Sequence, residues 1–266
     1  MSQAKKGFMY VICYFLLFAA TSIIASERES IIHQKGQLDV CIWPDYFSIS
    51  YYNDRSNKLE GIDIDLSKAF AKELNVKINY VTSHFGRFMN DLEKGKCDIA
   101  MFGIAATKNR KKRVDFSNTY LSSHMYAITV KKHPFIKSWK DIDQKGVIVA
   151  VQKGTYMESA MSKKLKNASL TITTEPNQRE LEVRSGRADV FITDFPYGQK
   201  MISLFDWAKL IPLEKSSEPL NYAYAIRKGQ PDWLEKVNQF VTKIKEDGRL
   251  KTYAEKHKLA PIAIFQ

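Results

Sequence analysis

The residues best suited to chemistry lie between Met101 and Ser117, in the run MFGIAATKNRKKRVDFS. A strand-like apolar stretch there reaches a glycine, and Thr107 and Arg110 follow one helical turn apart. A helix start offers unpaired backbone N–H groups, and a hydroxyl and a guanidinium three residues apart can converge on one anion. The pattern predicts a carboxylate-binding site, although these two side chains also fit a basic, solvated first turn.

The rest of the chain alternates short β-rich runs with amphipathic helical ones. The predicted strands are 38–43, 76–82, 97–104, 147–152, 170–174, 189–193 and 222–227. Helices are predicted at 64–74 and 231–246, where apolar residues recur at helical spacing. This order predicts an α/β protein with mostly parallel sheets flanked by helices. About 240 residues beyond a leader suffice for one large domain or two smaller ones.

The N-terminus has the features of a targeting signal. Lys5 and Lys6 precede an apolar stretch from Phe8 to Ile24, and small residues follow. We expect residues 1–25 to be a cleaved signal peptide and the mature protein to be periplasmic. A retained membrane anchor is the alternative, because the apolar run approaches the ~18 residues that span a bilayer.

Charge and cysteine usage narrow the function classes. The formal net charge is +12, but the lysines are scattered and no aromatic-basic ladder is present, so we expect a solvated surface that steers anionic ligands and no nucleic-acid partner. Cys41 and Cys97 lie on predicted strands, where level strand ends would separate them by ~13 Å, so two free thiols are expected. Without CxxC, HExxH or a His/Cys cluster, no metal or cofactor is expected.

The segment 103–120 closely resembles a motif of the bacterial extracellular solute-binding proteins of family 3, the periplasmic receptors of polar amino-acid ABC transporters. The family pattern is roughly G-M-T-x-T-x-x-R-x-x-x-V-D-F-S-x-P-Y, and the matching positions here are Gly103, Thr107, Arg110, Val114, Asp115, Phe116, Ser117 and Tyr120. Ala105 stands where the family usually carries Ser or Thr, and Thr119 where it often carries Pro. The missing hydroxyl at 105 removes one possible ligand contact.

Three further blocks extend the resemblance over nearly the whole mature chain. Segment 61–66, GIDIDL, resembles G-F-D-V-D-L, and we expect its acids to be capping and surface groups. Segment 152–156, QKGTY, resembles Q-x-G-T/S-T, a strand-to-helix turn whose amides meet the ligand carboxylate. Segment 188–194, ADVFITD, resembles D-A-V-x-x-D, whose second acid takes the ligand ammonium.

The resemblance implies a two-lobed periplasmic-binding-protein fold of type II, with the ligand cleft between the lobes. Lobe 1 would comprise 27–121 and 225–266, lobe 2 would comprise 125–219, and the hinge would lie near 121–125 and 219–225. The implied ligand-binding residues are Tyr46, Phe85, Gly103, Ala105, Thr107, Arg110, Thr155, Tyr156 and Asp194. Arg110 and Thr107 would hold the ligand carboxylate, and Asp194 its ammonium. Tyr46 and Phe85 would line the side-chain pocket, although such rings are more often core.

The implied function is an amino-acid receptor that makes and breaks no bond, so no catalytic residue is expected.

 A ligand would close the hinge between the lobes, and the closed form would deliver it to an inner-membrane ABC permease. We expect the receptor to be a monomer.

Two alternatives remain open. Cyclohexadienyl dehydratases share this architecture, but they carry a catalytic Glu directly after a G-T-N turn. Met157 occupies that place here, and Glu158 lies one residue too far, on a different side of the helix. The second alternative is a ligand-sensing module that acts through a separate partner.

Overall fold

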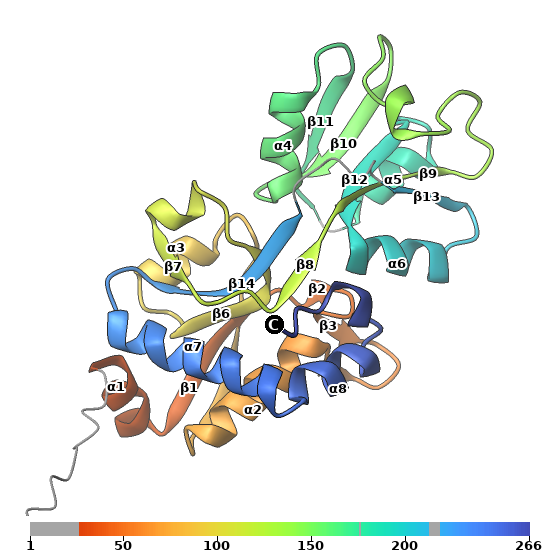
Figure 1. Cartoon of the computed structure of the whole chain (residues 1–266). Helices are drawn as coiled ribbons and strands as arrows, with labels where there is room; N and C mark the ends of the chain where they lie inside the picture. The colour runs from red at the N-terminus through yellow and green to blue at the C-terminus, as the bar shows by residue number, and fades with distance from the viewer. Residues whose placement is uncertain (1–26, 176, 213–218) are drawn as a thin grey trace, which may run out of the picture.

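The computed structural model describes residues 27–175, 177–212 and 219–266. The predicted signal peptide, residues 1–25, therefore lies outside the described residues. The chain folds into two α/β lobes, each built around its own sheet, and the strands β8 (Leu121–Ser123) and β14 (Leu220–Arg227) lie in the passage between them (Figure 1). The architecture agrees with the predicted two-lobed α/β fold class.

The first lobe contains a six-stranded sheet in the order β5-β1-β6-β14-β7, with β8 paired to β14. Its other strands are β1 (Gln37–Ile42), β5 (Lys77–Thr82), β6 (Ile99–Ala105) and β7 (Val114–Phe116). A separate three-stranded sheet is formed by β2 (Asp45–Tyr46), β3 (Ser50–Asn53) and β4 (Lys58–Glu60). The helices of this lobe are α1 (Glu27–Lys35), α2 (Ile62–Glu73), α3 (Phe88–Glu93), α7 (Pro231–Glu246) and α8 (Arg249–Lys256), with the 3-10 turns η1 (Arg110–Lys112) and η3 (Ala260–Ile262).

The second lobe contains a five-stranded sheet in the order β11-β10-β12-β9-β13. These strands are β9 (Met125–Val130), β10 (Ile148–Gln152), β11 (Ser169–Thr173), β12 (Val190–Asp194) and β13 (Ala208–Pro212). Its helices are α4 (Tyr156–Lys164), α5 (Gln178–Arg184) and α6 (Phe195–Leu204), with the 3-10 turn η2 (Trp139–Asp141).

Each sheet has a parallel half and an antiparallel half, whereas mostly parallel sheets were expected. Strands β5, β1 and β6 run parallel, as do β11, β10 and β12, because helices connect them. Strands β14 and β9 pair antiparallel with β6 and β12. The chain reaches each of these two strands directly from the other lobe and not through a helix of the same lobe. They therefore need not run parallel to their neighbours.

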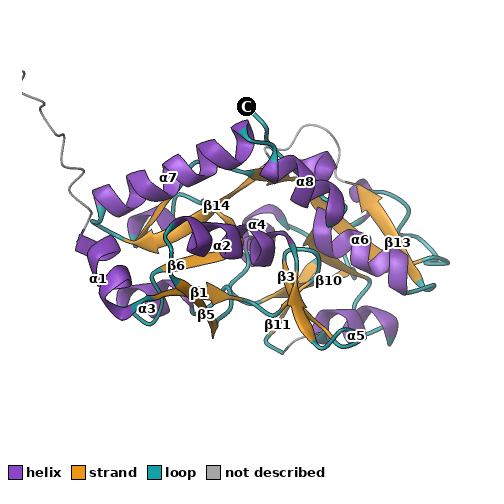
Figure 2. Ribbon diagram, turned by 90° about the horizontal axis from the view of Figure 1, so that it is seen from below, coloured by secondary structure: helices purple, strands orange, loops and turns teal. Residues whose placement is uncertain are grey.

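Helices α2 and α7 lie side by side along the first lobe (Figures 1 and 2). The ring of Phe70 on α2 lies 5.6 Å from that of Trp233 and 4.5 Å from that of Phe240, both on α7. Helix α7 has the predicted bounds, because its apolar residues recur at helical spacing and form one buried face. Helix α2 begins at Ile62, two residues earlier than predicted.

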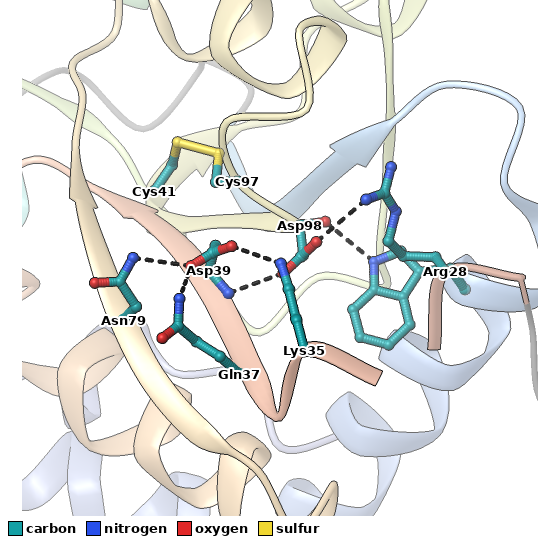
Figure 3. A network of polar contacts seen from close by, with 9 residues as sticks. Arg28, Lys35, Gln37, Asp39, Cys41, Asn79, Cys97 and Asp98 are labelled. Atoms are coloured by element: carbon teal, nitrogen blue, oxygen red, sulfur yellow. Dashed lines mark hydrogen bonds and ion pairs between the residues drawn. A yellow bond between two sulfur atoms is a disulfide. The ribbon is translucent and has the colours of Figure 1, made fainter. Parts of the chain in front are cut away.

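A polar network fastens α1 to the start of β6 (Figure 3). The Asp98 carboxylate accepts hydrogen bonds from Arg28 at 3.3 Å and from Lys35 at 2.8 Å, and it also accepts the backbone N–H of Asp39. The indole N–H of Trp233 donates to the carbonyl of Asp98 at 3.1 Å. The N-terminal segment α1–β1 and helix α7, which are far apart in the sequence, therefore meet at the N-terminal end of β6.

Cys41 and Cys97 form a disulfide beside this network, so the prediction of two free thiols is wrong (Figure 3). Their Cα atoms lie 5.6 Å apart. Strand β6 begins only at Ile99, and Cys41 pairs with Ala100. Cys97 precedes the strand and is not extended along it, so the ~13 Å separation expected from a straight strand does not apply.

Loss of this disulfide is expected to destabilise the protein. The bridge joins residues 56 positions apart, and a loop of that length corresponds to about 4 kcal/mol of lost chain entropy in the unfolded state. We expect the Cys41→Ala/Cys97→Ala variant to lose about 2–4 kcal/mol of unfolding free energy in urea. The single Cys41→Ala variant should lose a similar amount, whereas equal stability of the double variant and the oxidised protein would contradict a structural bridge.

Of the helices within the described ranges, none has both the length and the apolar character that crossing a membrane requires. The apolar stretch from Phe8 to Ile24 lies outside those ranges.

Candidate ligand-binding site

Asp194 ends strand β12 and begins helix α6, so its side chain lies at the carboxyl edge of the second sheet. One carboxylate oxygen accepts the backbone N–H of Tyr197 at 3.4 Å as a helix cap. The other accepts the hydroxyl of Tyr222 at 2.6 Å and the hydroxyl of Tyr46. Because Tyr46 belongs to the first lobe and Tyr222 to β14, Asp194 joins the two lobes across the cavity.

Arg110 begins the 3-10 turn after β6 and is 7% exposed. Its guanidinium donates to the carbonyl of Ala105 at 2.9 Å and, across the cavity, to the carbonyl of Gly154 at 3.1 Å. The rings of Phe85 and Phe88 lie 5.5 and 5.4 Å from its guanidinium carbon. Burial lowers the pKa of Arg110 to about 10. Among the described residues no carboxylate pairs with this guanidinium, which leaves a buried cation for an anionic ligand.

Gly103 is held in place by Asp63, which sequence reasoning assigned to capping or surface. The Asp63 carboxylate is fully buried and accepts the N–H of Gly103 at 2.8 Å, the hydroxyl of Tyr120 at 2.6 Å and that of Tyr224 at 3.2 Å. That assignment is wrong because the first turn of α2 packs beneath β6, where the carboxylate meets three donors. Asp63 thereby fixes the backbone at Gly103, which has φ +60° and lines the cavity.

A pH dependence of stability follows from Asp63. Burial raises its pKa to about 7, and the three hydrogen bonds only partly oppose this effect. The unfolded carboxyl ionises near pH 3.9, so the native state binds more protons between about pH 4 and pH 7 and the unfolding free energy falls as pH rises through that window. We expect Asp63→Asn to remove this decline, as measured by urea unfolding at several pH values. An unchanged pH profile would contradict it.

The turn after β10 meets the first lobe at Gly154. Its N–H donates to the Glu158 carboxylate at 2.5 Å, and the N–H of Thr155 donates to the carbonyl of Gln152 at 3.3 Å. The resemblance assigned the amides of this turn to the ligand carboxylate, and those of Gly154 and Thr155 are engaged within the turn in this structure. Thr155 caps helix α4 by accepting the N–H of Glu158 at 3.4 Å, and Tyr156 begins the helix.

A cavity of about 410 Å³, counting the space that opens to solvent, lies between the lobes. Eight of the nine predicted residues line it: Tyr46, Phe85, Gly103, Ala105, Arg110, Thr155, Tyr156 and Asp194. Thr107 does not line it, because its hydroxyl oxygen accepts the N–H of Arg110 at 3.3 Å and supports the turn that carries the guanidinium.

Several other residues that line the cavity were not predicted from the sequence, among them Trp43, Arg179, Tyr197 and Tyr222. Tyr222 lies on a predicted strand and within the predicted hinge segment 219–225, and that position could have identified it as a lining residue. Arg179 lies in helix α5, and no local pattern marks it, because a charged helix residue is normally solvated.

The arrangement offers a cation and an anion facing one cavity from opposite lobes, with aromatic rings between them. Arg110 can bind a carboxylate, and Asp194 can bind an ammonium group. The described residues contain no group of three or more His, Cys, Asp or Glu side chains arranged to hold a metal ion. These features define a two-lobed α/β binding protein with its ligand cavity between the lobes.

The comparisons with known proteins identify the family. Residues 38–260 match the sequence model of the bacterial extracellular solute-binding proteins, family 3, and the chain belongs to this family. The resemblance read from the motifs is thereby confirmed.

Two solved structures and one curated relative illustrate the similarity. An ancestral amino-acid-binding protein, a precursor of cyclohexadienyl dehydratase, is 34% identical with a TM-score of 0.79, and the match covers 86% of this chain and 98% of that one. An amino-acid ABC transporter substrate-binding protein of Streptococcus pneumoniae, bound to L-arginine, is 29% identical with a TM-score of 0.79, covering 88% and 99%. The cyclohexadienyl dehydratase of Pseudomonas aeruginosa is 27% identical over 196 residues, 73% of each chain.

Proposed function

We propose that the protein is a periplasmic receptor that binds an amino acid between its lobes and delivers it to an inner-membrane ABC permease. The observation that carries this proposal is the opposed pair Arg110 and Asp194, which matches the carboxylate and ammonium of a zwitterion. The carboxylate of the ligand would replace the carbonyl of Gly154 as the partner of Arg110. Its ammonium would replace the hydroxyl of Tyr46 at Asp194.

The direct contacts between the lobes support a hinge-closing mechanism. Arg110 reaches Gly154 and Tyr46 reaches Asp194 across the cavity, so a ligand can enter only if the lobes first separate. We propose that lobe 1 (27–121 and 225–266) and lobe 2 (125–219) rotate about segments 121–125 and 219–225. The ligand would then bridge them, and the closed form would engage the permease as a monomer.

Periplasmic delivery rests on the family and on the N-terminal sequence. Members of this family are extracellular solute-binding proteins, and we propose that residues 1–25 direct export and are then cleaved.

Dehydratase activity is the second candidate, because a cyclohexadienyl dehydratase is among the relatives. The catalytic Glu that dehydratases carry after the G-T-N turn has no counterpart among the described residues that line the cavity. Met157 lines the cavity, and the carboxylate of Glu158 accepts the N–H of Gly154 at 2.5 Å. We therefore propose a binding protein without catalysis.

A thermal-shift screen of residues 27–266 tests this proposal. The panel contains the twenty amino acids, prephenate and arogenate, and a ligand that binds only the folded state adds about 2.7 kcal/mol of stability at a hundredfold excess over Kd. We expect a shift with one or a few amino acids and no release of phenylpyruvate from prephenate or arogenate. The absence of a thermal shift with every amino acid would refute the proposed receptor function. Release of phenylpyruvate would favour the dehydratase.

A further inference from the structure

Arg179 is a second buried guanidinium in the wall of the same cavity. It lies on α5 in the second lobe, is 5% exposed and lines the cavity together with Arg110 and Asp194. Its guanidinium carbon lies 4.2 Å from the ring centre of Tyr197, a residue whose backbone N–H donates to the carboxylate of Asp194. Arg179 therefore stands on the same wall as the proposed ammonium-binding carboxylate.

Its partners leave part of the guanidinium available. The Nε of Arg179 donates to the Glu180 carboxylate at 2.8 Å, and the hydroxyl of Tyr197 also interacts with the guanidinium. Glu180 itself does not line the cavity. An arginine has five N–H donors in a planar fork, so the terminal nitrogens of Arg179 keep donors for a ligand. Glu180 and the rings of Tyr197 and Phe191 hold the guanidinium in one orientation.

The charged side chains in the cavity wall comprise two cations and one anion. Within the described part of the chain they are Arg110, Arg179 and Asp194. The backbone of an amino acid uses Arg110 for its carboxylate and Asp194 for its ammonium. Arg179, whose Nε pairs with Glu180 outside the wall, keeps its terminal N–H groups for the ligand side chain. Resting on the proposed receptor function, we infer that the ligand carries a second carboxylate, bound by Arg179, and is an acidic amino acid such as L-aspartate or L-glutamate.

A cationic ligand is the competing possibility, because one oxygen of Glu180 is buried without a hydrogen-bond partner. Arg179 lines the cavity and Glu180 does not, so a ligand cation would meet the guanidinium before that oxygen. Such a ligand would also bring a like charge next to a buried guanidinium, which is unfavourable in a desolvated site. The net basic surface, with a formal charge of +12 for the whole chain, favours an anionic ligand as well.

Isothermal titration calorimetry with matched ligands tests the inference on the unaltered protein. We expect L-glutamate or L-aspartate to bind about 10- to 100-fold more tightly than its own amide, L-glutamine or L-asparagine, because only the acid gains a charge-assisted contact. L-arginine and L-lysine should bind more weakly still. Equal affinity for acid and amide, or tighter binding of L-arginine or L-lysine, would overturn the inference while leaving the receptor proposal intact. Absence of binding by every amino acid would overturn both.

Variants of Arg179 test whether this residue recognises the side-chain carboxylate of the ligand. Arg179→Gln should lower the affinity for the acidic ligand much more than the affinity for its amide. Because this change leaves Glu180 buried without its cation, the Arg179→Gln/Glu180→Gln variant provides a neutral pair with the same expected result. Arg184→Gln, on the exposed face of the same helix, is the matched control and should bind like the unaltered protein. An equal loss for acid and amide in both Arg179 variants would show that Arg179 has no role in side-chain selection.

Discussion

Replacement of Arg110 by alanine is expected to weaken ligand binding by about a hundredfold or more while the protein stays folded. The guanidinium is the buried cation available to the ligand carboxylate in the first lobe, and each charge-assisted hydrogen bond contributes roughly 1.5–3 kcal/mol. Two such bonds to one carboxylate correspond to about 3–6 kcal/mol, and each 1.4 kcal/mol is tenfold in Kd. Calorimetric titration with the ligand found in the screen measures the loss.

Two further variants test the reason for that loss. Arg110→Lys keeps the charge but loses the planar fork, so an intermediate affinity is expected. Arg113→Ala removes a neighbouring arginine that pairs with Glu93 outside the cavity and should leave affinity unchanged. Full affinity in Arg110→Ala, with native circular dichroism, would refute the assignment of Arg110 to the ligand carboxylate.

The Gly154→Ala variant is expected to prevent closure of the lobes and to lower affinity by about 10- to 100-fold. A Cβ atom at this position would lie 2.6 Å from the backbone nitrogen of Gly86 and 2.7 Å from its Cα, in the opposite lobe. Backbone atoms there cannot yield as a flexible side chain does, so the lobes must stay apart. The ligand then loses charge-assisted contacts from one lobe, each worth roughly 1.5–3 kcal/mol. Calorimetry measures the affinity. Small-angle X-ray scattering measures closure as the decrease in radius of gyration on ligand addition.

Gly186→Ala is a matched control for Gly154→Ala. Both glycines have positive φ, +75° and +79°, but a Cβ atom at 186 meets nothing within 4 Å. Each substitution should therefore cost roughly 1–2 kcal/mol of stability for the left-handed backbone, and only that at 154 should affect closure. The same affinity and the same contraction in both variants would show that Gly154 does not limit the approach of the lobes.

Local sequence patterns predicted the helices and strands that are long and periodic. Helix α7 has the predicted bounds because its apolar residues form one continuous buried face. The short strands β2, β3 and β4 were not predicted, since two to four residues carry too little periodicity. Eight of the nine predicted site residues line the cavity because they lie at or shortly after the carboxyl ends of strands, where ligands of open α/β sheets bind. Thr107 is the exception, because its hydroxyl supports the turn beneath Arg110.

The sequence by itself indicated the family, the alternation of strands and helices, and Arg110 and Asp194 as residues of the cavity, because each of these rests on a motif of residues close together in the chain. Tertiary structure alone decided the disulfide, the burial of Asp63 and the place of Arg179 in the cavity. The disulfide joins residues 56 positions apart, and Asp63 bonds Tyr224, which lies 161 positions away. No local spacing encodes such contacts, since they arise only when the two sheets form and the lobes meet across the cavity.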